Sequence, residues 1–490
     1  MSAPATGPGA GTAAYAVADI RAAEATAMAA LPEGALMLRA AHGLAGVVGD
    51  LLRARAGRLV GGRVLLLAGS GDNGGDALHA GAVLARRGVQ VHALVLGDRP
   101  HPGGLAACEA AGGRVVTAPH GRYDLVVDGI VGIGGRPGLR PDAVAALGAV
   151  AGTPVVAVDV PSGVGVDDGT LAGDHVRAAD TVTFGPLRVA HLVDPAAAAT
   201  GRVHVVSLGP EVDAALAAGP PPVAVALTAA DVAALVPRPD PVAHKYTRGV
   251  VGVRAGSATY PGAGLLAVAG ASCGLAGMVR HVGAPEVLAL VHRRYPEVVG
   301  AGRVQAWVVG SGGGAEAADH LAAAVADHVP VVADADALPA AWERATADPA
   351  AVGSRLVLTP HAGELAALVG VTRAEVEARP WHHVHAAVGA SGAVVLLKGR
   401  RTLVAAPGLP TRVTTSGTPW LATAGAGDVL AGVIGALLAA GLAPADAAAV
   451  GSWWHGVAAT RAARRGPIRA LDVAEHLPSS LAAVLPDWRP

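Results

Sequence analysis

The sequence is poor in cysteine, lysine, asparagine and aromatic residues, and it carries almost no net charge. Its two cysteines, Cys108 and Cys273, lie far apart and outside any Cys-x-x-Cys motif. This excludes a disulfide framework and a cysteine zinc site, and it favours a reducing, cytoplasmic location. With 37 basic and 38 acidic residues the net charge is −1, so no basic field exists to bind nucleic acid or an acidic membrane.

Long apolar runs are also missing. The longest, Val429 to Ala445, is interrupted by glycines and by Pro444 and is shorter than the roughly 18–20 residues that a bilayer span needs, so we expect a buried helix there. The N-terminus has no basic residue before Arg21 and no continuous apolar block, and therefore does not resemble a secretory signal. We expect the first dozen residues to be a disordered tail.

What the sequence does contain is apolar residues, at 52%, in a chain of 490 residues. This length and composition predict a globular protein with a large core, divided into two to four domains of roughly 100–200 residues each. In the first half, short apolar runs alternate with helical patterns, which is typical of a doubly wound, Rossmann-like parallel sheet. The strands are expected at 63–69, 89–96, 125–127, 155–158, 181–184 and 203–208, with a helix from Asp76 to Arg87.

The proline-rich segment 217–224 shows no periodicity and is the best candidate for a linker. Beyond it the alternation of strands and helices restarts, so we expect one α/β domain over 1–216 and a second, different α/β domain over 225–490. No repeat relates the two halves. In the second half the strands are expected at 250–254, 304–309, 329–333, 356–358, 394–397 and 402–405.

A glycine-rich loop, Gly69 to Asp76, joins the first predicted strand to the helix that follows it. Backbone N–H groups and the helix dipole hold anions at such a position, so the loop predicts a phosphate site. The loop also contains Asn73, the only asparagine of the chain, between two acids. The alternative is a glycine turn needed only for tight packing of strand against helix.

Two aspartates, Asp128 and Asp159, end predicted strands, and ligands of open parallel sheets bind where strands end. Asp128 leads into a glycine-rich loop able to close over a ligand, and Asp159 leads into a Pro-Ser-Gly turn that contains Ser162. Carboxylates with nearby Asn and Ser oxygens could also hold a hard cation. A solvated strand end or a helix cap remains the alternative for either aspartate alone.

These motifs resemble the NAD(P)H-hydrate epimerases, whose loop reads Asn-Asn-Gly-x-Asp and whose later segment reads Asp-x-Pro-Ser-Gly; the resemblance covers the first half of the chain. It implies that Asn73, Asp128 and Ser162 bind K⁺ and that Asp159 is a catalytic carboxylate. Two positions depart from the family: Asp72 replaces an asparagine, and Arg188 replaces a lysine, which keeps a phosphate contact but cannot transfer a proton. The implied contacts with the hydrated nucleotide are Asp72, Asn73, Gly74, Gly75, Asp76, Gly132, Ile133, Gly134, Gly135, Arg136, Pro137, Gly138 and Asp159.

The strongest segment of the second half is Thr423 to Gly432, a glycine turn that leads into an apolar helix. Such a turn forms an anion hole, and Asp428 beside it could act as a base toward a hydroxyl that attacks a phosphoryl group. This is the arrangement of the ribokinase-like kinases. An ordinary capping aspartate is the alternative, since Asp is favoured near helix N-termini.

Further segments, among them Val332 to Leu338, Thr359 to Glu364 and Gly310 to Gly313, together with the Gly-x-Gly-Asp turn, resemble the ADP- or ATP-dependent NAD(P)H-hydrate dehydratases from about Ala224 to the C-terminus. Ser311, where the family has proline, and the alanines beside Gly425 suggest altered affinity and not lost chemistry. The resemblance implies substrate contacts at Gly264, Gly312, His361 and Asp428, with Asp428 catalytic. It implies nucleotide contacts at Lys398, Gly399, Arg400, Arg401, Thr402 and Gly427.

Together the two resemblances imply a bifunctional repair enzyme. Its first domain would interconvert the R and S epimers of hydrated NADH or NADPH, and its second would dehydrate the S form with ADP or ATP and Mg²⁺, releasing phosphate and, from ADP, AMP. A ribokinase-like small-molecule kinase fused to a non-catalytic nucleotide-binding module is the alternative. A dehydrogenase is disfavoured because no Gly-x-Gly-x-x-Gly turn followed by a ribose-binding acid is evident. The preferred nucleotide, the preferred hydrate and any homo-oligomer stay open.

Two conspicuous clusters are interpreted as structural. His382, His383 and His385 cannot all share one helix face, and no carboxylate lies near them in the sequence, which argues against a metal site. Trp453, Trp454 and His455 lie on an apolar helix and are expected to form core and pocket wall.

Overall fold

The computed structural model describes residues 12–485, and the expected disordered tail lies almost wholly outside this range. The chain divides into two compact units, residues 1–224 and 225–490, which are described separately. The predicted linker is partly regular: α7, Pro210–Ala218, ends within it, and β9, Ala224–Ala226, begins at its last residue.

The first unit is built on a seven-stranded sheet in the order β4-β3-β2-β5-β6-β7-β8, in which all neighbours pair in parallel. The doubly wound parallel sheet expected from the sequence is confirmed. Sequence reasoning missed only the short edge strand β4, which is mostly exposed and polar at its start. The strands are β2 (Arg63–Ala68), β3 (Gln90–Val95), β4 (Arg114–Val116), β5 (Leu125–Gly129), β6 (Val155–Val158), β7 (Asp180–Phe184) and β8 (Arg202–Val206).

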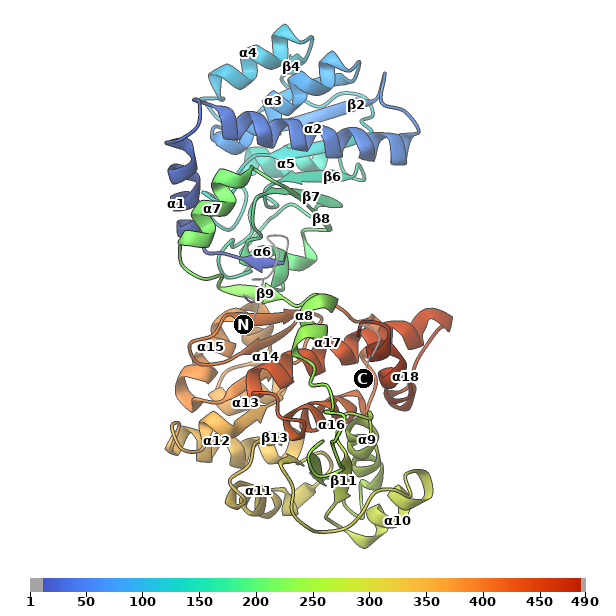
Figure 1. Ribbon diagram of the computed structural model, residues 1–490. Helices are drawn as coiled ribbons and strands as arrows, with labels where there is room; N and C mark the ends of the chain where they lie inside the picture. Colours follow the sequence, from blue (N-terminus) through green and yellow to red (C-terminus); the bar gives the residue numbers. More distant parts are fainter. Residues whose placement is uncertain (1–11, 486–490) are drawn as a thin grey trace. The chain divides into compact units, whose positions relative to one another are not determined.

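Helices pack on both faces of this sheet (Figure 1). One core contains apolar side chains of α2, α3 and α7 together with alternate residues of β2, β5 and β6, and the other contains α5 with the intervening residues of β2 and β5. Period-two burial of this kind is expected for central strands covered on both sides. The helices are α1 (Val17–Met28), α2 (Ala35–Ala56), α3 (Asp72–Arg86), α4 (Pro102–Ala110), α5 (Pro141–Ala149), α6 (Val189–Leu192) and α7 (Pro210–Ala218).

Helix α3 begins four residues earlier than predicted, at Asp72 and not at Asp76. Two consecutive glycines disfavour a helix by propensity. Here tertiary packing overrides propensity, because a side chain at Gly74 would collide with the carbonyl of Gly69. The predicted phosphate loop is therefore the first turn of the helix.

The second unit contains a mixed sheet whose order includes β9-β17-β16-β15-β14-β13-β12-β10-β11. The strands from β11 to β15 are parallel, and β15, β16 and β17 pair antiparallel. The second α/β unit is thus confirmed, with β9, β11 and β17 added as strands that the sequence did not indicate. The strands are β9 (Ala224–Ala226), β10 (Val250–Arg254), β11 (Met278–His281), β12 (Ala306–Val309), β13 (Val331–Ala333), β14 (Leu356–Leu358), β15 (Val394–Leu397), β16 (Thr402–Ala405) and β17 (Thr411–Thr414).

Helices α9, α16, α17 and α18 share one core with this sheet, while α11, α12 and α15 pack on other strand surfaces (Figure 1). The run Val429 to Ala445 is not one helix as predicted: α16 ends at Ala439, and the chain turns at Gly441 in the left-handed region (φ 102°) before α17 starts at Pro444. The helices are α8 (Ala229–Leu235), α9 (Pro261–Ala271), α10 (Pro285–Arg294), α11 (Ala317–Ala326), α12 (Leu338–Ala347), α13 (Ala362–Val369), α14 (Arg373–Ala378), α15 (Pro380–Ser391), α16 (Ala426–Ala439), α17 (Pro444–Ala462) and α18 (Ala470–Ala482).

Within residues 12–485, one helix, α2, is long and apolar enough by length and composition to cross a membrane. A core helix of a globular protein passes the same test. The buried face of α2 packs in the core of the first unit, which accounts for its composition.

Candidate functional sites

The first candidate site lies at the carboxyl end of β2, where the chain turns into α3. Close approach requires glycine here: a side chain at Gly69 would collide with the carbonyl of Ile130. Asn73 is buried in the first turn of α3, and its Nδ2 has no hydrogen-bond partner among the described residues. A buried amide without a partner is costly, so this position favours a bound polar ligand.

Asp128, in the adjacent strand β5, is fully buried and meets no cationic side chain in its hydrogen bonds. Its carboxylate accepts from Ser162 Oγ at 2.6 Å, from Ser162 N at 2.9 Å and from Ile130 N at 3.2 Å. Burial raises the pKa of Asp128 to about 6, against the hydrogen bonds from Ser162, which lower it. A buried carboxylate with hydroxyl and amide oxygens nearby has the donor chemistry of a hard-cation site.

Asp159, which follows β6, is held in the left-handed region with φ 64°. Aspartate tolerates this conformation better than most residues, but it still costs about 1–2 kcal/mol. Oδ1 of its buried carboxylate accepts from Thr183 Oγ1 at 3.0 Å and lies 3.0 Å from an Arg188 guanidinium nitrogen. These contacts both involve Oδ1, and no hydrogen bond to Oδ2 is found among the described residues.

Arg188 is 1% exposed. Besides the ion pair with Asp159, its guanidinium donates to the carbonyls of Phe184 and Pro186. In this structure the guanidinium neutralises the Asp159 carboxylate, and its buried Nε has no hydrogen-bond partner among the described residues. The phosphate contact expected for Arg188 stays a prediction.

A group of carboxylates surrounds this ion pair. Burial, and then repulsion by Asp159 and Asp72, raise the pKa of Asp76 well above its usual value. Burial also raises the pKa of Glu24 on α1, against the attraction of Arg188. Glu24 comes from a helix far away in the sequence, and no motif signal singled it out. Burial and mutual repulsion thus favour the protonated form of Asp76 and Glu24 relative to ordinary carboxyls.

The predicted substrate loop 132–138 runs beside these groups without regular structure. A Cβ at Gly132 would lie 2.8 Å from Asn73 Oδ1, and one at Gly134 would lie 3.1 Å from an Arg21 nitrogen. The loop also closes on the turn after Asp159, because Gly138 N donates to Gly163 O at 2.9 Å. Hence the structure brings the predicted first-unit residues, Asp72 to Asp76, Asp128, Gly132 to Gly138, Asp159 and Ser162, to one edge of the sheet.

In the second unit the centre of the candidate site is Asp334, which directly follows β13. Its carboxylate accepts from Lys398 Nζ at 2.8 Å, from Thr359 Oγ1 at 2.8 Å and from Ser311 Oγ at 3.2 Å. These donors follow the neighbouring parallel strands β15, β14 and β12, so four strand ends converge on one carboxylate. Although burial alone lowers it, attraction to Asp334 and Glu364 carries the pKa of Lys398 above its usual value.

Asp428 enters this site from the first turn of α16, whose N-cap, Gly425, is in the left-handed region with φ 85°. Burial, and then repulsion by Asp334, raise the pKa of Asp428 to about 6, against the lowering effects of Ser311 and Lys398. Gly427 lies beside them, since a Cβ there would be 3.4 Å from Lys398 Nζ. A carboxylate with a pKa near neutrality at a helix N-terminus suits proton transfer beside an anion.

A cavity of about 740 Å³ opens next to this carboxylate pair. Its wall includes all of the predicted nucleotide contacts: Lys398, Gly399, Arg400, Arg401, Thr402 and Gly427. His455 of α17 also lines it, while Trp454 is fully buried and donates its Nε1 hydrogen to Leu477 O at 2.8 Å. This confirms that the Trp-Trp-His segment forms core and pocket wall.

Comparison with known proteins finds matches to both halves of the chain. Residues 33–190 match the family model described as YjeF-related protein N-terminus, and residues 251–479 match that described as NAD(P)H-hydrate dehydratase. The chain is 46% identical to the bifunctional NAD(P)H-hydrate repair enzyme of Mycobacterium tuberculosis, covering 89% of this chain and 91% of the relative, and 44% identical to that of Mycobacterium leprae, covering 96% and 99%. The chain belongs to the family of bifunctional NAD(P)H-hydrate repair enzymes.

Among solved structures, the ADP/ATP-dependent NAD(P)H-hydrate dehydratase of Bacillus subtilis, co-crystallised with ATP and Mg²⁺, matches with a TM-score of 0.46 and 26% identity. The match covers 52% of this chain and 97% of the Bacillus subtilis chain.

In this repair enzyme the remaining predicted substrate contacts of the second unit have different environments. Gly264 is buried in α9, where a Cβ would meet Ala255 O at 2.5 Å, so close packing alone requires glycine there. Gly312 is half-buried in the left-handed region after β12. His361 caps α13, accepting from Glu364 N at 3.1 Å, and is exposed beside Lys398.

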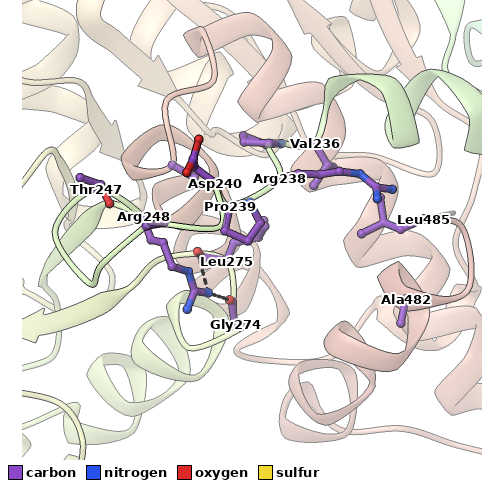
Figure 2. A pocket seen from close by; sticks show the side chains of 13 residues that line it. Val236, Arg238, Pro239, Asp240, Thr247, Arg248, Gly274, Leu275, Ala482 and Leu485 are labelled. Carbon is purple, nitrogen blue, oxygen red and sulfur yellow. Dashed lines mark hydrogen bonds between the residues drawn. The ribbon is translucent and has the colours of Figure 1, made fainter. Parts of the chain in front are cut away.

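A second cavity of the repair enzyme, about 600 Å³, lies away from these groups. Figure 2 shows Arg248 reaching the carbonyls of Gly274 and Leu275 on one side of it and Arg238 extending toward Leu485 on the other. Arg248 lies just before β10, at the amino end of the strand, whereas Lys398 and Asp428 lie at the carboxyl end of the sheet. None of the predicted site residues lines this cavity.

Proposed function

We propose that the first unit interconverts the R and S epimers of NADH or NADPH hydrate, and that the second unit dehydrates the S epimer with ADP or ATP. The observation that carries the proposal is the pair of separate carboxylate sites, Asp159 with Arg188 and Asp428 with Lys398, each at the carboxyl edge of its own sheet. Buried, unpaired Cys108 and Cys273 favour action in the reducing cytoplasm.

In the first unit we propose that Asp159 passes a proton to the ring hydroxyl as the ring nitrogen's lone pair expels it as water, and takes a proton back from the water that adds to the opposite face of the ring. Oδ1 of Asp159 is occupied by Thr183 and Arg188, which leaves Oδ2 for the substrate. Asp76 and Glu24, whose pKa values are raised above the usual range chiefly by burial, lie in the same cluster and are the groups that could exchange protons with Asp159. The loop 132–138 would cover the nicotinamide ring, and the N–H groups at the start of α3 would face a phosphate.

Potassium fits the first unit, because Asp128 is buried without a cationic partner. Asn73, Asp128 and Ser162 would hold the ion, which would supply positive charge beneath the phosphate-binding turn. The proton chemistry proposed here belongs to the carboxyl groups and not to the ion.

In the second unit Asp428 is proposed to take the proton of the ring hydroxyl as the hydroxyl oxygen attacks the terminal phosphorus of ADP or ATP. The bond to AMP or ADP breaks, and phosphate then leaves the ring carbon as the nitrogen lone pair forms a C=N bond. Loss of a proton from the neighbouring carbon restores the dihydropyridine. Gly427 and the preceding backbone N–H groups would stabilise the transferring charge, with Lys398 beside them.

Magnesium would arrive with the nucleotide. The cavity wall contains Lys398, Arg400 and Arg401 but no carboxylate among its lining residues, so the ion would be held mainly by phosphate oxygens and water. Its chemistry is neutralisation of phosphate charge.

Recovery of absorbance at the reduced-nicotinamide band tests this function. The full chain is incubated with mixed hydrate epimers plus ADP, ATP or no nucleotide. The proposal predicts complete recovery with a nucleotide and none without, together with one phosphate released per hydrate. Recovery without nucleotide contradicts the dehydratase assignment, and a stable phosphorylated hydrate indicates a kinase instead.

A further inference from the structure

Two loops of the first unit are joined by a double bridge. One arm is the ion pair between the side chains of Arg188 and Asp159. The other arm runs through His191 of the short helix α6: its Nδ1 accepts from Arg188 N at 3.0 Å, and its Nε2 lies 2.8 Å from Asp159 O. His191 is 3% exposed, so water does not compete with either bond.

The two contacts fix the state of the ring. Because Nδ1 accepts a backbone N–H, the single ring proton must be on Nε2, where it is donated to the carbonyl of Asp159. Burial, and then the nearby Arg188 guanidinium, lower the pKa of His191 to about 4, so the ring is neutral at neutral pH. A neutral histidine in this tautomer orients its neighbours but does not supply a proton.

The residue that this ring holds is under backbone strain. Asp159 has φ 64°, and its N–H is anchored to Val182 O at 2.7 Å. Rotation of the Asp159 peptide toward a relaxed conformation would move the carbonyl that His191 binds and swing the carboxylate away from Thr183 and Arg188. The bond from Nε2 therefore opposes the relaxation that would misplace the carboxylate.

We propose that His191 is a positioning residue for epimerisation: its Nε2–H···O bond keeps Asp159 in the strained conformation that presents carboxylate Oδ2 to the substrate. This inference deepens the proposed function and rests on it. Nothing in the first-unit motifs marks His191, since it acts through Asp159 and does not touch the substrate.

Two conservative substitutions separate positioning from general stability. His191→Gln retains an N–H donor near the position of Nε2, whereas His191→Asn retains an acceptor near Nδ1 and loses the donor to Asp159. Each variant gives up one buried hydrogen bond. We expect H191N to lower kcat for epimerisation by about 10- to 100-fold with KM within about 2-fold, as a misplaced catalytic group does. H191Q should keep kcat within about 3-fold of the parent.

Controls come from the same chain. His92 is another buried histidine of the first unit, bonded to Tyr123 OH at 2.9 Å, and His92→Asn should lower the melting temperature without lowering kcat. Dehydration of purified S epimer should be unchanged in all three variants. If H191N does not fold, H191Q alone tests the proposal. A lower melting temperature with kcat retained supports the proposal, whereas a lower melting temperature with kcat lost overturns the proposal.

Equal losses of kcat in H191N and H191Q, or no loss in either, overturn the inference while the function stands. Absence of epimerisation in the unsubstituted chain is a different outcome, because it contradicts the proposed function itself.

Discussion

Lys398 Nζ lies 2.8 Å from Asp334 Oδ1, in a pair whose acid is 3% exposed and whose base is 21% exposed. The two residues follow β15 and β13, and Thr359, which follows the strand between them, donates to the same carboxylate oxygen. The pair lies beside Gly427. Besides burial, which raises the pKa of Asp428 most, repulsion by Asp334 raises it and attraction to Lys398 lowers it. The pair therefore couples the stability of the second unit to its chemistry.

Removing the cation of this pair should cost more than removing the whole pair. In Lys398→Met, Asp334 remains buried without its partner, and we expect a loss of about 3 kcal/mol in the free energy of unfolding. The double variant Asp334→Asn with Lys398→Met should recover part of that loss. Thermal or urea unfolding of both variants measures this, and an unchanged stability in K398M would contradict the account of the pair.

The pH dependence of dehydration should report Asp428. Because burial and Asp334 raise its pKa to about 6 and the base form is required, kcat/KM should fall as pH decreases through about 6. In K398M the midpoint should move to higher pH, since Lys398 stabilises the charged carboxylate. Arg412→Met serves as the matched control, because it removes the positive charge from a partly exposed ion pair with Asp446, whose atoms lie 3.9 Å apart. This variant should leave the midpoint unchanged.

We expect Asp128 to make the stability of the first unit sensitive to pH and to potassium. Its pKa in the folded chain, about 6, is raised above the ordinary value of 3.8, so the folded state binds the extra proton. Stability from this group is complete below pH 4 and decreases as pH rises from about 4 to about 6. Above that range a cation that binds the charged carboxylate should restore it.

We therefore expect K⁺ to raise the melting temperature of the first-unit transition at pH 7.5, with tetramethylammonium as the ionic-strength control. In Asp128→Asn the effect of K⁺ should disappear. A K⁺ effect of the same size in that variant would show that the ion binds elsewhere.

The sequence was informative where a motif coincides with the end of a strand. Asp128 and Asp159 were placed by the rule that ligands bind at the carboxyl ends of parallel strands, and the structure puts both there. The start of α3 was misplaced because the propensity of Gly74 and Gly75 opposes a helix that packing against Gly69 and His101 determines.

Residues that reach the site from other parts of the chain left no local signal. Glu24 reaches the first site from α1, and His191 reaches it through backbone atoms of Asp159 and Arg188. Asp334 lies in Val332 to Leu338, a segment that carried part of the family resemblance. Its position where four strand ends meet, however, depends on the order of the strands in the sheet. Such convergence of distant residues follows from topology, which spacing along one chain does not specify.

The central claim is that one chain uses two separate carboxylates for two successive steps, and one measurement tests it most directly. Mixed hydrate epimers and ADP are given to the full chain and to Asp159→Asn and Asp428→Asn, and the amplitude of rapid absorbance recovery is compared. We expect the unsubstituted chain to convert all of the hydrate and D159N to stop at the S fraction. D428N should recover absorbance at least about 100-fold more slowly, as loss of a general base does. Equal amplitudes in the unsubstituted chain and D159N, or near-normal rates in D428N, would contradict the account.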